Sequence, residues 1–257
     1  MRVIIVPCLQ DNYAYLIHAE GSRRALVVDP SEAEPVRGAL DAHGLELAGI
    51  LNTHHHWDHT GGNEELCQAF GELPVYGHGS DAGRIPLLSS KLTHGESFEA
   101  AGLAFRALHV PGHTSGAVAY VTGDAVFTGD TLFAAGCGRL FEGTPAQMYE
   151  SLNEKLGALP DETRVYCGHE YTASNLRFAA HVEPSNADVR AKAERVAVLR
   201  ERGEPSVPST IGEERRTNPF MRCESEEIQK SVAERLSGAA SPIEVLAAIR
   251  AAKDSFK

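Results

Sequence analysis

The densest chemical signal in the sequence is a run of imidazole and carboxylate side chains. It contains His54, His56, Asp58 and His59 in the pattern H-x-H-x-D-H. Such groups cannot all be buried close together without a partner, and imidazole with carboxylate suits zinc, iron or another divalent ion. The alternative is an expression tag or a chance cluster of histidines. The internal position and the interleaved Asp58 argue against that alternative, so the run predicts a metal site.

Three later residues extend the predicted site. His113, Asp130 and His169 each follow a glycine, which leaves room for backbone at a crowded centre. Each also comes shortly after a segment of strand composition. Taken singly, each is an ordinary loop residue. Because the first run cannot complete two metal sites, we interpret all three, in this order, as further ligands.

The elements expected around these residues place them in loops at strand ends. An apolar strand over 47–52 leads into the histidine run, and Gly61 and Gly62 then turn the chain into a helix near Asn63–Phe70. Loops that follow strands are where α/β folds place their sites. Further strands are predicted over 3–6, 13–18, 25–29, 104–110, 117–121, 125–128 and 163–167 from their β-branched and apolar residues.

Helix signals divide the chain into two parts. Ser31 is predicted to cap a helix that ends at Gly44, and Thr144 opens a helix to about Leu156 with a capping box. After about Thr172, helical patterns replace strand patterns. They cover 172–181, 186–202, 225–236 and 242–253, the last with a capping box, and 203–219 is predicted to be a long loop. We expect an α/β domain over 1–172 and a helical domain over 173–257.

Composition excludes several classes of protein. The chain has 257 residues, 42% hydrophobic content and a net charge of −11, which disfavours nucleic acid as a partner. Residues 1–172 carry a net charge of −12 and residues 173–257 a net charge of +1. No stretch approaches the roughly 18 apolar residues that span a bilayer. Five scattered cysteines argue against a disulfide framework. We therefore expect a cytoplasmic protein without a membrane partner, and a monomer by default.

Four motifs resemble one family within the metallo-β-lactamase superfamily. They are THHHWDHTGGN over 53–63, GCGRLFEG over 136–143, GHEY over 168–171 and NPFMR over 218–222. Together they are similar to glyoxalase II, and the resemblance covers nearly the whole chain. It implies an αββα sandwich followed by a small all-helical C-terminal domain that binds substrate.

The resemblance also implies a division of the ligands between two metal ions. The first ion would be held by His54, His56 and His113. The second would be held by Asp58, His59 and His169, and Asp130 would bridge them. His55 and Trp57 would have no ligand role, and His109 is interpreted as a strand residue. Zinc is expected in both sites, with iron or manganese as alternatives.

A substrate clamp follows from the same resemblance. Glutathione would be held by Arg139, Tyr171, Arg250 and Lys253 and by backbone near Cys137. Arg250 and Lys253 lie three residues apart on one helix face, where two cations suit a carboxylate. The alternative is a solvated basic helix end. Arg139 stands where some members carry Lys, and Phe141 where some carry Tyr, which we expect to change affinity rather than chemistry.

The activity implied is hydrolysis of a glutathione thioester. S-(2-hydroxyacyl)glutathione, with S-D-lactoylglutathione as the expected case, would yield glutathione and D-lactate, the second step of methylglyoxal detoxification. A metal-bridging hydroxide would be the nucleophile, with Asp58 and Asp130 as catalytic carboxylates. Two other readings remain open. One is another superfamily enzyme, such as a lactonase, β-lactamase, nuclease or sulfur dioxygenase. The other is a metal-binding or sensing protein without turnover.

Overall fold

The computed structural model describes residues 1–236, 238 and 240–256 as two compact units. The first unit consists of residues 1–109 and 116–129, and the second consists of the described residues among 110–115 and 130–257. Each unit is described by itself below.

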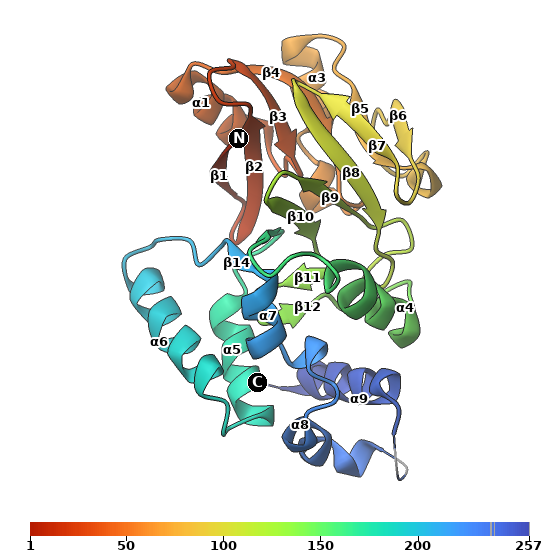
Figure 1. Cartoon of the computed structure of the whole chain (residues 1–257). Helices are drawn as coiled ribbons and strands as arrows, with labels where there is room; N and C mark the ends of the chain where they lie inside the picture. The colour runs from red at the N-terminus through yellow and green to blue at the C-terminus, as the bar shows by residue number, and fades with distance from the viewer. Residues whose placement is uncertain (237, 239, 257) are drawn as a thin grey trace. The chain divides into compact units, whose positions relative to one another are not determined.

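The first unit contains a mixed sheet whose six strands lie side by side in chain order (Figure 1). The strands are β1 (Arg2–Cys8), β2 (Asn12–His18), β3 (Arg24–Val28), β4 (Glu46–Leu51), β5 (Val75–His78) and β6 (Ser90–Leu92). The pairs up to β3 are antiparallel, and β3 to β6 run parallel. Helices α1 (Ala33–His43) and α3 (Asn63–Phe70) bury Leu40 and Leu66 in one apolar cluster with Val27 and Ile50 of this sheet.

A second sheet in the same unit packs on the first. The strands of this sheet that belong to the first unit are β7 (Ser97–Ala100), β8 (Leu103–His109), β9 (Val118–Thr122) and β10 (Ala125–Gly129). Tyr15 meets Phe127 at 5.5 Å between ring centres, and Tyr76 stacks on Phe98 at 4.9 Å. These aromatic contacts join the two inner faces, as in other face-to-face sheet packings.

The second unit is mainly helical. Its helices are α4 (Pro145–Tyr149), the π-helical η2 (Glu150–Leu156), α5 (Thr172–Val182), α6 (Ala187–Glu201), α7 (Ile211–Thr217), η3 (Pro219–Met221), α8 (Glu226–Ser231), η4 (Ala233–Arg235) and α9 (Pro242–Ser255). A short hairpin joins β11 (Leu132–Phe133) to β12 (Gly136–Cys137), and β13 (Arg164–Cys167) pairs with β14 (Ser209–Thr210). No helix in the described residues is both long and apolar enough to cross a membrane.

Most predicted elements are present, with ends shifted by one or two residues. The capping boxes at Thr144 and Ser241 are confirmed, and Gly44 ends α1 in the left-handed conformation at φ 63°. The predicted cap at Ser31 is wrong, because Glu32 takes the N-cap position without a side-chain cap bond. The Ser31 hydroxyl instead donates to the carbonyl of Asp58.

The long loop predicted over 203–219 is also wrong in part. Residues 209–217 form β14 and α7, and Thr210 caps α7 by accepting from the backbone N–H of Glu213 at 3.2 Å. Ile211 and Glu214 on this helix are fully buried. Proline, glycine and charge predicted a solvent-exposed loop here, whereas burial of this one helix face decides the outcome.

Candidate metal centre and substrate clamp

The histidine run begins where two parallel strands of the first unit end together. Strand β3 pairs in parallel with β4, and the N–H of Asp29 donates to the carbonyl of Leu51 at 3.0 Å. Asp29 therefore lies beside the segment that follows β4, although 25 residues separate it from His54. Carboxyl ends of parallel strands meet at one sheet edge, where such folds gather functional side chains.

Asp29 organises the start of this run. Its Oδ1 accepts from the N–H of Thr53 at 2.7 Å, and its Oδ2 accepts from the Thr53 hydroxyl at 2.6 Å. The same Oδ2 lies 3.1 Å from Nδ1 of His59. Because a carboxylate can only accept, His59 donates through Nδ1 and keeps Nε2 as a lone-pair donor for a metal. This role was not predicted from the sequence, in which Asp29 stands only at the end of a predicted strand.

His54 and His56 face each other through ring nitrogens. The Thr53 hydroxyl already donates to Asp29, so His54 Nδ1 donates to that hydroxyl at 3.1 Å and His54 Nε2 carries a lone pair. That Nε2 lies 3.1 Å from Nδ1 of His56. Two nitrogens bound tetrahedrally to one zinc ion would lie about 3.3 Å apart, so this pair fits a shared metal. Ligand atoms of Asp29, His54 and His59 also lie within 4.8 Å of one another.

The other members of the run point to different partners. Asp58 Oδ2 accepts from Asn12 Nδ2 at 3.1 Å and lies 3.6 Å from His59 Nε2. His55 Nδ1 lies 3.4 Å from Oδ2 of the buried Asp81. The side chain of Trp57 is 71% exposed. Asp58 therefore lies with His59, whereas His55 contacts a separate carboxylate.

The second unit brings together the three downstream residues. One carboxylate oxygen, Oδ2 of Asp130, lies 3.5 Å from Nε2 of His113 and 3.3 Å from Nε2 of His169. His113 Nδ1 donates to the carbonyl of Arg139 at 2.8 Å, which leaves Nε2 as the ligand atom. All three residues are at least nine-tenths buried. Imidazoles held this way by a backbone carbonyl are typical of metal sites.

The residues of the predicted clamp lie in this same unit. Tyr171 stacks on His169, with 4.7 Å between ring centres and 4° between ring planes. Arg250 on α9 is 7% exposed, and its Nη1 donates to the carbonyl of Cys137 at 2.7 Å. Lys253, one turn later, donates to the carbonyl of Ser174 at 3.1 Å. Tyr171 and Arg139 thus each contact a predicted metal ligand.

The electrostatics of α9 set Lys253 apart from an ordinary surface lysine. Burial, together with the positive charges of Arg250 and Arg177, lowers the pKa of Lys253 from 10.5 to about 8. Three cations in one partly buried region favour binding of an anion, which would relieve their mutual repulsion.

The histidines outside these clusters form a group of their own. His78 stacks on His109 at 4.1 Å between ring centres, and the N–H of His109 donates to Nδ1 of His94. Burial and the charges of His109 and His94 lower the pKa of His78 to about 4. His109 accordingly lies at the end of β8 against other imidazoles of the first unit.

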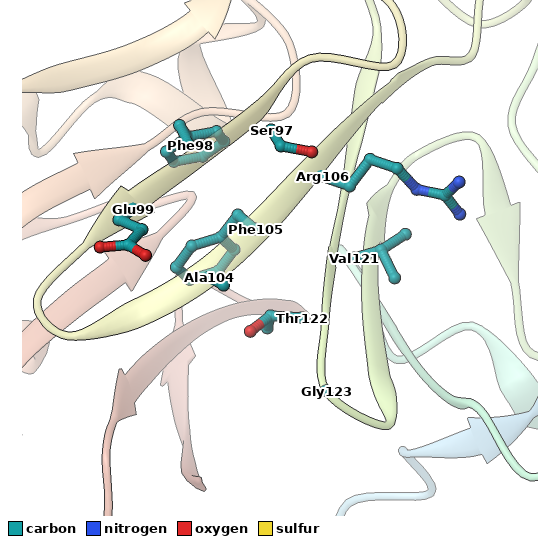
Figure 2. Close-up of a pocket in the computed structure, with 9 residues that line it drawn as sticks. All are labelled: Ser97, Phe98, Glu99, Ala104, Phe105, Arg106, Val121, Thr122 and Gly123. Carbon is teal, nitrogen blue, oxygen red and sulfur yellow. The ribbon is translucent and has the colours of Figure 1, made fainter.

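A hollow on β7, β8 and β9 lacks the imidazole and thiolate groups that suit a transition-metal site. It encloses about 540 Å³ and is lined by side chains that include Phe98, Phe105, Glu99 and Arg106 (Figure 2). None of its lining residues is a histidine or cysteine. The clusters around His54 and Asp130 are therefore the better candidates for chemistry.

Two known families match adjacent parts of the chain. Residues 10–169 match "Metallo-beta-lactamase superfamily", and residues 170–256 match "Hydroxyacylglutathione hydrolase C-terminus". The histidine run lies within the first match, and the superfamily fold together with these His/Asp groups supports a divalent metal site.

Curated relatives match over the full length. A hydroxyacylglutathione hydrolase of Synechococcus sp. (strain JA-2-3B'a(2-13)) is 50% identical over 258 residues, covering 100% of both chains. One of Methylococcus capsulatus (strain ATCC 33009 / NCIMB 11132 / Bath) is 51% identical over 259 residues, covering 100% of this chain and 99% of its own.

Solved structures share the fold. The crystal structure of ETHE1 from Myxococcus xanthus has a TM-score of 0.66 at 28% identity and covers 98% of both chains. TTHA1623, solved in a di-iron-bound form, has a TM-score of 0.58 at 30% identity and covers 86% of this chain and 100% of its own. These matches confirm the predicted metallo-β-lactamase fold with a helical C-terminal part. The chain belongs to the hydroxyacylglutathione hydrolase, or glyoxalase II, family of the metallo-β-lactamase superfamily.

Proposed function

We propose that this protein hydrolyses S-(2-hydroxyacyl)glutathione, with S-D-lactoylglutathione as the main substrate, to glutathione and D-lactate. The observation that carries the proposal is identity of about half of all residues, over the whole chain, to relatives named for this activity. The buried Arg250 beside Cys137 supports it, because a fixed guanidinium suits the carboxylate of glutathione.

We propose that two divalent ions are bound by the seven predicted ligands, which are His54, His56, Asp58, His59, His113, Asp130 and His169. The chemistry of these side chains supports this, because imidazole together with carboxylate suits divalent ions. The di-iron form of TTHA1623 is compatible with two ions, and zinc, iron and manganese all suit these ligands.

Within this proposal, the chain's own residues prepare the site. Bound divalent ions supply Lewis acidity and lower the pKa of water toward neutrality. Asp29 fixes His59 so that Nε2 faces the site, and the Arg139 carbonyl does the same for His113. Asp58 and Asp130 would supply carboxylates to the ions, and one oxygen of Asp130 already faces two imidazoles.

The remaining residues of the clamp position the substrate. Arg250, Lys253 and Arg139 bind the carboxylate end of glutathione, while Tyr171 and the backbone at Cys137 line its path to the metal ligands. The leaving group is a thiolate of a thiol with pKa near ~8.5, so no separate general acid is needed. We accordingly propose a catalytic domain over 1–172 and a substrate-binding domain over 173–257.

The decisive experiment is hydrolysis of S-D-lactoylglutathione by purified protein, with metal content measured on the same sample. We expect robust turnover with about two metal ions per chain. Turnover with one tightly bound ion would refute the binuclear centre. Two bound ions without turnover of any acylglutathione would refute the substrate and favour another superfamily activity.

Binding should weaken as Lys253 loses its proton. Because its pKa is about 8, KM for the thioester should rise severalfold between pH 7 and 9.5, with a smaller change in kcat. The lowered pKa costs stability at neutral pH, and this cost is relieved as the pH rises through about 8, since the unfolded chain then binds more protons than the folded one. A higher KM at high pH would therefore not be due to unfolding of the protein caused by deprotonation of Lys253.

The pH dependence is checked by initial rates over this range. Lys253→Arg should keep KM low at pH 9.5, because its guanidinium stays charged. Lys253→Met should show a raised KM throughout. A KM of the native enzyme that is flat to pH 9.5 would exclude Lys253 from binding.

We also propose that the enzyme is monomeric and works in the reducing cytoplasm. All five cysteines are free, and burial raises the pKa of Cys137 to about 11 and of Cys167 to about 12. Thiols with such values are largely protonated at neutral pH and react slowly with oxidants.

A further inference from the structure

Asp254 links the two arginines of the clamp through a single oxygen atom. Its Oδ1 accepts from Nη2 of Arg250 at 3.1 Å and lies 3.5 Å from Nε of Arg139. Arg250 is on α9, one turn before Asp254, whereas Arg139 follows β12, more than 100 residues away in sequence. The contact with Arg139 is therefore tertiary.

The place of Asp254 on α9 is unfavourable for the helix itself. It lies in the last turn, where the partial negative charge of the helix end disfavours a carboxylate. An Arg that precedes an Asp by four residues is also the weaker orientation for an ion pair on a helix. Helix stability thus gives no reason for a carboxylate here.

The two guanidiniums differ in how firmly the rest of the fold holds them. The side chain of Arg250 is 9% exposed, and Cys137 fixes it from the other side. The side chain of Arg139 is 65% exposed, and it forms an ion pair with Asp254. Without that carboxylate, repulsion between like charges would favour conformations in which Arg139 turns away from Arg250.

We propose that Asp254 is a positioning residue of the glutathione clamp. Its carboxylate holds Arg139 next to Arg250, so that both guanidiniums meet one substrate carboxylate. This inference rests on the function proposed above and adds to it a residue that binds no substrate atom itself. It assigns Asp254 an effect on affinity rather than on the chemical step.

Asp254 can stay in place when substrate binds. A guanidinium has five N–H groups, and the hydrogen bonds to Cys137 and Asp254 occupy two of those of Arg250. Its Nε is buried and has no hydrogen-bond partner within the described part of the chain. Donors thus remain for a ligand while the carboxylate keeps the arginines together.

The first test is Asp254→Asn, which keeps the shape and removes the charge. KM for S-D-lactoylglutathione and the dissociation constant for glutathione should both rise about tenfold, while kcat stays within about twofold. The melting temperature should change little, because loss of the ion pair with Arg250 is offset by removal of the unfavourable charge at the helix end. Asp254→Glu should recover most of the affinity.

Asp41→Asn is a matched control. Asp41 is also an exposed carboxylate in the last turn of a helix, α1, four residues after an arginine. It belongs to the first unit and to no part of the clamp, so its variant should keep native KM and kcat.

A double-mutant cycle separates positioning from a general structural role. In an Arg139→Ala background, Asp254→Asn should have little further effect on KM, because the side chain that it positions is gone. Additive effects, or an unchanged or lower KM for Asp254→Asn alone, would overturn the inference while leaving the proposed function intact. Native enzyme that neither hydrolyses an acylglutathione nor binds glutathione would overturn both.

Discussion

Replacing Asp130 with alanine should abolish turnover and lower the metal content. We expect kcat/KM for S-D-lactoylglutathione to fall by at least about 10³-fold and bound metal to drop from about two ions to one or fewer. The reason is that one oxygen of Asp130 faces both His113 and His169. Its removal would take a negative ligand from two ions at once.

The measurement combines steady-state kinetics with elemental analysis of the same preparation. Asp130→Asn would show how much of the loss is due to charge, since the amide keeps one oxygen in place. Circular dichroism should match the native spectrum, and Asp41→Ala, an exposed carboxylate on α1, serves as a control for handling. Full activity with full metal loading in Asp130→Ala would remove Asp130 from the ligand set.

Replacing Glu214 with alanine should cause a large loss in the free energy of unfolding. Glu214 is fully buried, and its Oε1 accepts from Nζ of Lys192 at 2.6 Å. Its Oε2 accepts from the N–H of Ala135 at 2.7 Å and from the amide of Asn218 at 2.9 Å. Asn218 in turn donates to the carbonyl of Gly136 at 2.9 Å, so the network supports the hairpin that carries Cys137.

We expect Glu214→Ala to lower the free energy of unfolding by about 3–5 kcal/mol, because removal of one partner leaves a buried charge undercompensated. Glu213, at 3.0 Å from Lys192, can replace only part of the lost interaction. Burial raises the pKa of Glu213, but Lys192 and Arg195 outweigh it and bring the value down to about 2.

Urea denaturation of the purified variants measures this effect. Glu226→Ala is the control, since its ion pair with Lys230 is exposed and should contribute less than about 1 kcal/mol. A Lys192→Met, Glu214→Gln double variant should be more stable than Lys192→Met alone, because the fully buried position 214 then carries no charge, while Glu213 keeps its ion pair with Arg195. If Glu214→Ala lowers the free energy of unfolding no more than Glu226→Ala does, the buried network around Glu214 contributes little to stability.

Much of the candidate site was predictable because its chemistry is local in sequence. The H-x-H-x-D-H spacing brings His54 and His56 onto the loop after β4, and Asp58 and His59 onto the one-turn helix α2 (Trp57–Thr60) that follows it. Helix caps were predictable for the same reason, since the side chains of Thr144 and Ser241 bond to backbone three residues away. Short strands β5, β6 and β7 were missed, because three or four residues carry too little periodicity to be recognised.

Other features depend on contacts between distant segments, and only the tertiary structure decided them. Asp29 reaches Thr53 because β3 and β4 pair in parallel. Helix α7 forms because Glu214 is buried against Lys192, although the surrounding composition is that of a loop. Asp254 reaches Arg139 because α9 packs near the β12 turn. Local propensity and periodicity determine which residues can act, whereas their partners depend on which strands pair and which helix faces are buried.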